Sequence, residues 1–392
     1  MKNKRLYVLA PNDRFNYGDL LFPYVLTSYF KKYFDDIVYV STTKSDLSSK
    51  GGFPTLGYSA LFNVDETWEN HLIVAGGESL CVRWYVILSY IYKNVDILKR
   101  FAWKLKKIIG PIALKLVGTL VDELYHTKTR FVFSVGKNEL PQFKTIVYNA
   151  LGGSSLLKSD VLHSKKTKKI LSSVDFISVR EDDTSLALSK AGISHELCPD
   201  TAILMSDIFS ENFLLSKLSV GSKIFKDKQY IIFQGNLNIW RNKYEIAAQQ
   251  IEKLYFKFKM PICLCPIGTA IGHSDDVVLE RIAEKIHDKN AFFIVENPNI
   301  FDIMWLIKHS KMYIGSSLHG VITSMSFNVP YVGYGGRKQI AYIEKWADYN
   351  VKTAVYSNFY DVALLNIGLS VCSDNQKGLV KNMLDKILDF YK

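Results

Sequence analysis

The fold of this chain follows from one stretch, Lys311-Met-Tyr-Ile-Gly-Ser-Ser-Leu-His-Gly-Val-Ile-Thr-Ser-Met-Ser-Phe-Asn-Val-Pro-Tyr-Val-Gly-Tyr334. Residues 311–314 form a short, mostly apolar run that ends at a glycine, which is typical of a buried parallel strand. Ser316 or Ser317 can cap the helix that follows, and a second apolar run begins after Pro330. Strand, helix and strand in this order predict half of a βαβ repeat, with a ligand crevice beyond the carboxyl ends of the strands.

His319 lies at the turn between the expected strand and the expected helix. A lone histidine in an apolar segment is often a core residue whose ring nitrogens bond to the backbone. In the first turn of a helix, however, the positive end of the helix dipole favours the neutral imidazole, which can accept a proton near pH 7. Both interpretations stay open from physics alone, and the second predicts a chemical role.

The composition indicates a globular protein of two domains with anionic partners. The 392 residues, of which 48% are hydrophobic, are enough for two cores of ordinary size. The net charge of +11 favours nucleic acid, an acidic membrane surface, or phosphorylated and carboxylated small molecules. Because the sequence has no RGG tract, zinc-finger spacing or RNP-type aromatic motif, we expect no nucleic-acid partner.

The N-terminus and the cysteines predict a cytoplasmic protein. The apolar run 6–10 is too short for the core of a signal peptide. Five cysteines, an odd number at scattered positions, fit reduced thiols better than a disulfide framework. Cys263 and Cys265 share one face of an expected strand, which favours buried side chains over a metal site. No cluster with metal-ligand spacing is visible, so we expect neither a metal nor a cofactor.

The alternation of strands and helices predicts two Rossmann-like domains. The first spans residues 1–205, and after a polar stretch the alternation restarts and continues over 228–375. A last amphipathic helix, 376–392, is expected to fold back and brace the two halves. Strands are expected at 5–10, 37–41, 72–79, 130–136, 175–180, 230–233, 262–266, 291–295, 311–314 and 331–334, and helices at about 20–33, 244–257 and 277–287.

Polar loops after the expected strands supply candidate site residues in the first domain. Asn16, Gly18 and Asp19 follow the first strand and lie on the ligand side, unless they only cap the helix, for which Asp19 is the expected N-cap. Gly76 and Gly77 let backbone amides approach a ligand closely or simply turn the chain.

Charged residues end other expected elements near the same crevice. Arg180 ends a strand and points into the crevice or pairs with an acidic neighbour. Asp200 faces the loop side or caps the short helix after it. Asp276 ends the polar loop that follows an expected strand of the second domain.

The segment 93–121 differs in composition and is expected to be an insertion in the first domain. Cations alternate with large apolar residues from Lys93 to Lys115, which predicts a basic amphipathic helix. The apolar run 108–121 is interrupted by Pro111 and is shorter than the ~20 residues that span a bilayer. The segment is either a solvated helix with its aromatic residues in the core or a helix on an anionic membrane surface.

Taken in order, these motifs resemble the polysaccharide pyruvyl transferase family over most of the chain. The matching segments are Asn16-Tyr-Gly-Asp19, Gly76-Gly77, Ile177-Ser-Val-Arg-Glu181 with Ser185 following, Pro199-Asp200, the loop 266–276, Leu318-His-Gly320, and Asn328-Val-Pro330 followed by Lys338. The family usually has Arg-Leu-His-Gly at the histidine, whereas this chain has Ser317 in place of the arginine.

The resemblance implies an α/β fold of two Rossmann-like, doubly wound domains facing a cleft, as in the glycosyltransferase B architecture. It implies a transferase that moves a pyruvyl group from phosphoenolpyruvate, the donor substrate, to a sugar of a cell-surface polysaccharide or of its lipid-linked precursor. The product would be a pyruvate ketal that bridges two hydroxyls. The first domain would bind the acceptor and the second the donor.

Roles for the candidate residues follow from this chemistry. His319 is the expected catalytic acid and base. Arginine holds carboxylate and phosphate bidentately, and the amides at the start of a helix form an anion nest. The expected donor-binding residues are Arg180, Ser316, Ser317, Leu318, Gly320, Arg337 and Lys338. The expected acceptor or cleft residues are Asn16, Gly18, Asp19, Gly76, Gly77, Asp200 and Asp276.

Two other functions remain open. One is a nucleotide-sugar-dependent glycosyltransferase of the same architecture, for which Glu296 at the end of a strand is the best candidate for binding the ribose. The other is a non-catalytic protein of glycan assembly, suggested by Ser317 in place of the arginine. A lipid-linked acceptor would place the protein at the inner face of the plasma membrane, held there as a peripheral protein.

Overall fold

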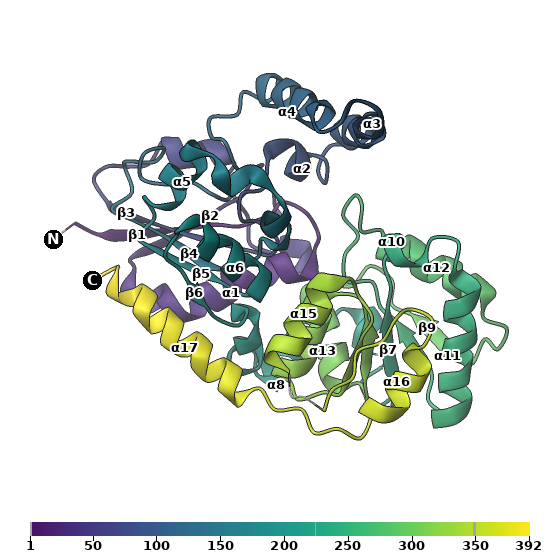
Figure 1. Cartoon of the computed structure of the whole chain (residues 1–392). Helices are drawn as coiled ribbons and strands as arrows, with labels where there is room; N and C mark the ends of the chain where they lie inside the picture. Colours follow the sequence, from purple (N-terminus) through teal and green to yellow (C-terminus); the bar gives the residue numbers. More distant parts are fainter. Residues whose placement is uncertain (1, 224, 348–349) are drawn as a thin grey trace.

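Two parallel sheets, each covered by helices, divide the chain (Figure 1). The computed structural model describes residues 2–223, 225–347 and 350–392. The first sheet has the order β2-β1-β3-β4-β5-β6, and its strands are β1 (Lys4–Leu9), β2 (Asp36–Val40), β3 (Glu69–Ala75), β4 (Thr145–Leu151), β5 (Phe176–Val179) and β6 (Glu196–Leu197). The second has the order β11-β10-β7-β8-β9, with β7 (Ile231–Gln234), β8 (Ile262–Leu264), β9 (Phe292–Ile294), β10 (Tyr313–Gly315) and β11 (Tyr331–Gly333).

Helices connect the strands of both sheets, as expected for doubly wound α/β domains. Those of the first half are α1 (Tyr17–Phe30), α2 (Trp84–Leu88), α3 (Lys93–Ile109), α4 (Ile112–Leu124), α5 (Lys165–Leu171) and α6 (Asp182–Ala191). Between the halves lie α7 (Met205–Ile208), α8 (Glu211–Lys217) and α9 (Val220–Lys223). The second half has α10 (Leu237–Trp240), α11 (Tyr244–Phe258), α12 (Asp275–Lys285), α13 (Ile300–His309), α14 (Leu318–Ser326), α15 (Arg337–Trp346), α16 (Phe359–Asn366) and α17 (Asp374–Asp389).

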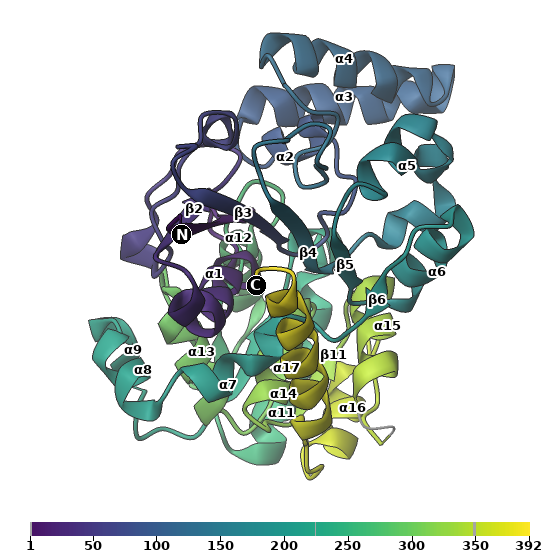
Figure 2. The same cartoon turned by 90° about the vertical axis from the view of Figure 1, so that its left-hand side faces the viewer.

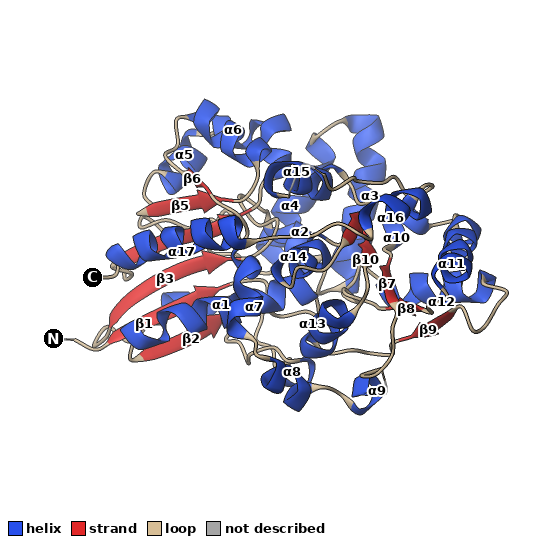
Figure 3. Ribbon diagram, turned by 90° about the horizontal axis from the view of Figure 1, so that it is seen from below, coloured by secondary structure: helices blue, strands red, loops and turns tan. Residues whose placement is uncertain are grey.

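The stretch around His319 forms the predicted strand, turn, helix and strand, namely β10, α14 and β11. Helices α1, α14 and α17 lie between the two sheets and share one apolar core, to which both sheets contribute. The outer face of each sheet has its own core. Because one core is common to both halves, it fixes the orientation of the two sheets relative to each other. Their carboxyl ends face each other (Figure 3).

Several predicted elements differ from the structure. Residues 130–136 form no strand but a buried irregular segment, and the strand in this region is β4, at Thr145–Leu151. Both segments are apolar and β-branched, so periodicity could not tell them apart. Helix α1 begins three residues earlier than expected, which places Asp19 in its first turn and Asn16 at the N-cap. Helix α12 likewise begins at Asp275, two residues early.

The segment 93–121 forms two helices rather than one. Helices α3 and α4 lie side by side as a hairpin that packs on α2, away from the second domain (Figures 1 and 2). Within residues 2–223, 225–347 and 350–392, no helix has both the length and the apolar character that a bilayer span requires.

The last helix, α17, runs back from the second half to the first sheet (Figure 2). Lys4 Nζ donates a hydrogen bond of 2.7 Å to the carbonyl of Tyr391, just after the helix. At its other end, Lys377 Nζ lies 3.1 Å from the carboxylate of Asp207. Its side chains Val380, Leu384 and Ile387 are fully buried in the shared core, so α17 ties the two halves together.

Truncation of this helix in the core should therefore destabilise the whole molecule. Leu384→Ala removes a side chain that is 0% exposed and should lower the free energy of unfolding by about 2–5 kcal/mol. Leu379→Ala, on the same helix but 40% exposed, is the matched control and should cost under about 1 kcal/mol. Denaturant unfolding measures both, and equal losses would show that α17 does not brace the core.

Candidate active site

A cavity of about 630 Å³ lies where the carboxyl ends of the two sheets face each other. The first domain contributes the loops after β1 and β3 together with α2, and the second contributes the loops after β7, β8, β10 and β11. This is the place where open α/β sheets bind ligands. The predicted site residues that line the cavity are Asn16, Asp19, Gly77, Ser316, Ser317, Leu318, His319, Arg337 and Lys338.

His319 lies in the first turn of α14, and the predicted cap of this helix is present. Ser317 is the N-cap residue, and its Oγ accepts a hydrogen bond of 3.3 Å from the amide of Gly320. The imidazole packs edge-on against Phe22, with ring centroids 5.6 Å apart. A Cβ at Gly18 would lie 1.8 Å from Nδ1 of the ring, so only glycine lets α1 come this close to His319.

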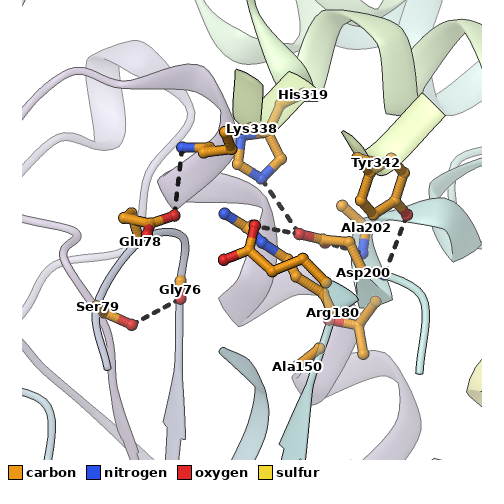
Figure 4. Close-up of polar contacts among 12 residues, drawn as sticks. Gly76, Glu78, Ser79, Ala150, Arg180, Asp200, Ala202, His319, Lys338 and Tyr342 are labelled. Atoms are coloured by element: carbon orange, nitrogen blue, oxygen red, sulfur yellow. Dashed lines mark hydrogen bonds and ion pairs between the residues drawn. The ribbon is translucent and has the colours of Figure 1, made fainter. Parts of the chain in front are cut away.

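His319, Asp200 and Arg180 form a buried charged chain (Figure 4). His319 Nε2 lies 3.5 Å from Asp200 Oδ2, and Arg180 Nη1 donates to the same oxygen at 2.6 Å. Asp200 Oδ1 accepts a hydrogen bond from the amide of Ala202. Asp200 is therefore the N-cap of the short helix Thr201–Leu204, which is one of its two predicted roles. The Asp200 amide in turn donates to Tyr342 Oη at 3.1 Å.

The charges in this chain are fixed by their partners. Burial raises the pKa of Asp200, but contact with His319 and the charge of Arg180 outweigh it, so the pKa lies below its ordinary value. Burial lowers the pKa of Arg180, but Asp200, Glu181 and Glu78 outweigh it and the pKa is raised. Asp200 therefore presents a carboxylate to Nε2 of His319, and this contact orients the ring.

Arg180 thus has a different place from the one predicted. We expected it to bind the donor directly, but its side chain is 0% exposed and lies behind the cavity, paired with Asp200. A side chain at the end of a parallel strand reaches the crevice only if it is not held by a buried acidic residue, as Arg180 is held by Asp200. Arg180 therefore acts on the cavity through Asp200 and His319.

Glu78 and Lys338 face each other across the cleft (Figure 4). Glu78 Oε1 accepts from the amide of Ser154 at 2.5 Å and from its hydroxyl at 2.7 Å, and Oε2 lies 3.9 Å from Lys338 Nζ. Burial raises the pKa of Glu78, but Lys338, Arg180 and the bonds from Ser154 outweigh it, so the pKa is lowered. The cavity therefore holds a carboxylate from the first domain beside a cation from the second.

Three arginines join Lys338 around the cavity. Arg337, at the start of α15, is 66% exposed in its side chain and bonds to Asp183 at 3.0 Å. Arg14, in the loop after β1, lies 2.9 Å from Asp13, and Arg83, at the N-cap of α2, lies 3.1 Å from Asp122. Each of the four cations is paired with a carboxylate, and the arginines keep further N–H donors with which the cavity can bind an anionic ligand.

The prediction that the backbone amides at the start of α14 bind an anion is wrong in part. The amides of Ser316 and Ser317 both donate to Gln234 Oε1, each at 2.9 Å. Asn236 Nδ2 donates to Ser316 Oγ at 2.9 Å. These amides are therefore already bonded by a side chain from β7, and arginine and lysine side chains are the stronger candidates for holding an anion.

Asp275, and not Asp276, faces the cavity. Asp276 is exposed, whereas Asp275 is buried and its Oδ2 accepts from Gln234 Nε2 at 2.8 Å and from the amides of Ile267 and Gly268 at 3.1 and 3.0 Å. Burial raises the pKa of Asp275 to about 7, although these hydrogen bonds oppose the rise. The prediction missed by one residue because α12 begins earlier than its sequence pattern indicates.

The remaining predicted residues shape the site from outside the cavity. Gly76 has φ of 117°, and a Cβ there would lie 2.5 Å from Pro11, so it turns the chain as one interpretation held. Gly320 packs on Tyr313, whose Oη would lie 2.1 Å from a Cβ. Gly18 and Asp200 contact His319, and Arg180 contacts Asp200, as described above.

Several residues of the site escaped prediction, namely Arg14, Glu78, Arg83, Tyr90, Gln234, Asn236, His273, Asp275 and Gln339. Glu78 directly follows the glycine pair and Gln234 ends a strand, so position alone could have indicated both. Arg83 precedes a five-residue helix that leaves no periodic signal, and only the packing of α2 brings it to the cavity.

Buried polar atoms without a hydrogen-bond partner gather at this site. Among the described residues they include His319 Nε2, Glu78 Oε2, Asp275 Oδ1, Arg83 Nε, and Nε and Nη2 of Arg180. Buried polar groups are normally paired, and an orphaned group requires a reason. A polar ligand in the cavity supplies one for the atoms that reach it.

The fold and the position of the cavity define a protein of the glycosyltransferase B type. The Methanocaldococcus jannaschii UDP-GlcNAc 2-epimerase in complex with UDP-GlcNAc and UDP matches with a TM-score of 0.54 at 10% identity, over 99% of each chain. The S. aureus MnaA–UDP co-structure matches with a TM-score of 0.54 at 11% identity, over 98% of this chain and 96% of that one. At such low identity the likeness shows the shared fold alone.

Comparison of the sequence with protein families shows to which family the chain belongs. The model of the family described as polysaccharide pyruvyl transferase matches residues 16–337, and the chain therefore belongs to the polysaccharide pyruvyl transferase family. No curated protein sequence matches the chain significantly.

The raised pKa of Asp275 predicts a pH-dependent stability. Its pKa is about 7 in the folded protein against an ordinary value of 3.8, so folding favours the protonated carboxyl. The stability from this group is full below pH 3.8 and is lost as the pH rises through 7. Asp275→Asn imitates the protonated form, so its stability relative to the wild type should rise by about 2–3 kcal/mol between pH 5 and pH 8.

Denaturant unfolding at the two pH values measures this difference. Asp276→Asn, at the exposed neighbour, removes the same charge without the buried contacts and should show no such rise. A constant difference between wild type and Asp275→Asn at both pH values would contradict the raised pKa.

Proposed function

We propose that this protein transfers the pyruvyl group of phosphoenolpyruvate to a sugar, forming a pyruvate ketal and releasing phosphate. Membership of the pyruvyl transferase family supports the reaction class. The observation that carries the proposal is the placement of His319, whose ring lines a cavity with cations on both sides while its Nε2 faces the Asp200 carboxylate at 3.5 Å. This arrangement suits proton transfer to an anionic substrate.

The donor fits the charges of the cavity. Phosphoenolpyruvate has a carboxylate and a phosphate, and arginine binds both groups bidentately. Arg337 and Lys338 come from the second domain, as the sequence predicted, while Arg14 and Arg83 come from the facing domain. Arg14 and Arg83 supply positive charge in a chain whose Ser317 replaces the arginine usual in the family.

The proposed reaction moves protons through His319. A proton is added to the methylene carbon of phosphoenolpyruvate, and a sugar hydroxyl forms a bond to the adjacent carbon and gives up its proton. The C–O bond to phosphate then breaks, and a second hydroxyl attacks the same carbon and closes the ketal. One hydroxyl proton replaces the proton added to the methylene group, and the other leaves with phosphate, so no cofactor is needed.

Asp200 and Glu78 have separate roles in this scheme. Asp200 stays ionised and stabilises the protonated imidazole, in the way a buried carboxylate orients a catalytic histidine. Glu78, whose pKa is also lowered, offers to the hydroxyls of the acceptor a carboxylate oxygen that accepts no hydrogen bond within the protein and lies 3.9 Å from Lys338 Nζ. The acceptor we favour is a sugar of a cell-surface polysaccharide or of its lipid-linked precursor, met at the inner face of the plasma membrane.

A direct assay tests the reaction. Incubation with phosphoenolpyruvate and a panel of free and lipid-linked glycans should give a product with the mass gain of a pyruvate ketal, together with released phosphate. His319→Ala should reduce the rate by about 10²–10⁴-fold, which is the usual contribution of general acid–base catalysis. His287→Ala, at a histidine whose side chain is 91% exposed, is the matched control and should keep the wild-type rate.

Two results would overturn the scheme. If His319→Ala stays within about threefold of the wild type, His319 is structural and the proton has another route. If no glycan gains mass although phosphoenolpyruvate binds, the protein is a non-catalytic binding protein of glycan assembly.

A nucleotide-sugar-dependent glycosyltransferase is the second candidate, because the similar solved structures hold UDP. Glu296, the expected ribose partner, is exposed and does not line the cavity, which disfavours this candidate. A thermal-shift panel separates the two: phosphoenolpyruvate should raise the melting temperature and UDP-sugars should not. Stabilisation by UDP-sugars alone would replace our proposal with the second candidate.

A further inference from the structure

The hairpin of α3 and α4 presents large apolar side chains to solvent. The side chains that are at least 43% exposed are Ile97, Phe101, Trp103, Ile108, Ile109, Ile112, Leu116, Leu120 and Leu124. Ile108 alone is 79% exposed. Single exposed apolar residues are common on soluble proteins, but a contiguous patch of this kind marks an interaction surface.

Seven of these side chains form two stripes, one along each helix of the hairpin. Ile97, Phe101 and Ile108 are separated by four and seven residues and therefore share one face of α3. Ile112, Leu116, Leu120 and Leu124 repeat every four residues along α4. The inner faces are different residues, such as Val95 and Ala102 of α3 and Val121 of α4, which are buried against the rest of the domain.

Cations lie next to the apolar stripe. Lys93, Arg100, Lys104 and Lys107, separated by seven, four and three residues, follow the adjacent face of α3 and are exposed. The acid of α3 points inward, because Asp96 is buried and bonds to Arg100 at 2.7 Å. The outer face of α3 is therefore apolar and positive.

We infer that this face, defined by the exposed apolar residues above together with Lys93, Arg100, Lys104 and Lys107, binds an anionic lipid bilayer with both helices parallel to its surface. An apolar stripe beside cations is the pattern of helices that lie in the membrane interface. A second copy of the chain fits less well, because a symmetric contact would place the cationic face of one molecule against that of the other. Anionic headgroups complement this charge.

The hairpin is connected to the cavity through α2. Arg83 and Tyr90 both line the cavity, and Arg83 bonds to Asp122 of α4 at 3.1 Å. Lys99 of α3 lies over the ring of Tyr90, with Nζ 4.6 Å from its centroid. A bilayer bound at the hairpin would thus lie beside the first domain's edge of the cavity. Delivery of a lipid-linked acceptor from there rests on the proposed function, whereas lipid binding itself does not.

Vesicle sedimentation without phosphoenolpyruvate or sugar tests the inference. The wild type should bind vesicles of phosphatidylglycerol and phosphatidylcholine better than pure phosphatidylcholine vesicles, and less at high salt, because the Debye length falls from about 30 Å at 0.01 M to about 3 Å at 1 M. The variant Lys93→Glu, Lys104→Glu, Lys107→Glu should bind about a hundredfold more weakly. Its control, Lys253→Glu, Lys257→Glu, Lys259→Glu, changes the net charge equally at exposed lysines of the second domain and should bind as the wild type does.

A second pair of variants tests the apolar stripes. Phe101→Ser, Ile108→Ser, Leu116→Ser should weaken binding by at least about tenfold, while Phe256→Ser, Val355→Ser, Leu365→Ser, at equally exposed sites of the second domain, should not. All four variants change exposed residues and should melt within a few degrees of the wild type. Turnover of a soluble acceptor should also stay unchanged, which separates this inference from the proposed reaction.

Three outcomes would overturn the inference. The first is equal binding to anionic and neutral vesicles at low salt. The second is equal loss of binding in the hairpin variants and in their second-domain controls. The third is a wild-type dimer, measured by light scattering, that the Phe101→Ser, Ile108→Ser, Leu116→Ser variant converts to a monomer, because the face would then join two copies of the chain.

Discussion

The buried chain of Arg180, Asp200 and His319 is the interaction on which the rest of the site depends. Arg180 follows the last residue of β5, Asp200 begins the link between the halves, and His319 lies in the first turn of α14 in the second domain. Removing one partner of a buried ion pair costs about 3–5 kcal/mol, because the other charge stays buried. The same contacts that stabilise the junction of the domains therefore also fix the position of the His319 ring.

Other contacts make this junction rigid. Tyr17 of α1 and Thr323 of α14 share a hydrogen bond of 2.8 Å, and Trp346 Nε1 donates to the carbonyl of Arg180 at 2.9 Å. Together with the shared apolar core, they hold the two sheets around a preformed cavity. Preorganisation matters for the proposed chemistry, because a site that is already arranged around charge spends no free energy on rearrangement during the reaction.

Two groups of cations lie in distinct places in the structure. One set of cations surrounds the cavity, where Glu78 and Asp19 place carboxylates beside them. The other set lies on the outer face of α3, beside apolar side chains. Net charge alone allowed nucleic acid, membrane or small anions, and only the positions of the cations separate those at the cavity from those on the hairpin.

The sequence by itself determined the local features: the β10, α14 and β11 stretch, the Ser317 cap, the turn at Gly76 and the presence of His319 at a loop beyond a strand. These depend on neighbours a few residues away, which periodicity and capping rules describe. The tertiary structure decided that residues 145–151, and not 130–136, form strand β4. It also decided that Asp275 rather than Asp276 faces the cavity, and that Arg180 pairs with Asp200. It also decided that Gln234 occupies the amides of α14, 82 and 83 residues away. Each outcome depends on which distant segments pack together, and hydrophobic pattern alone does not contain that information.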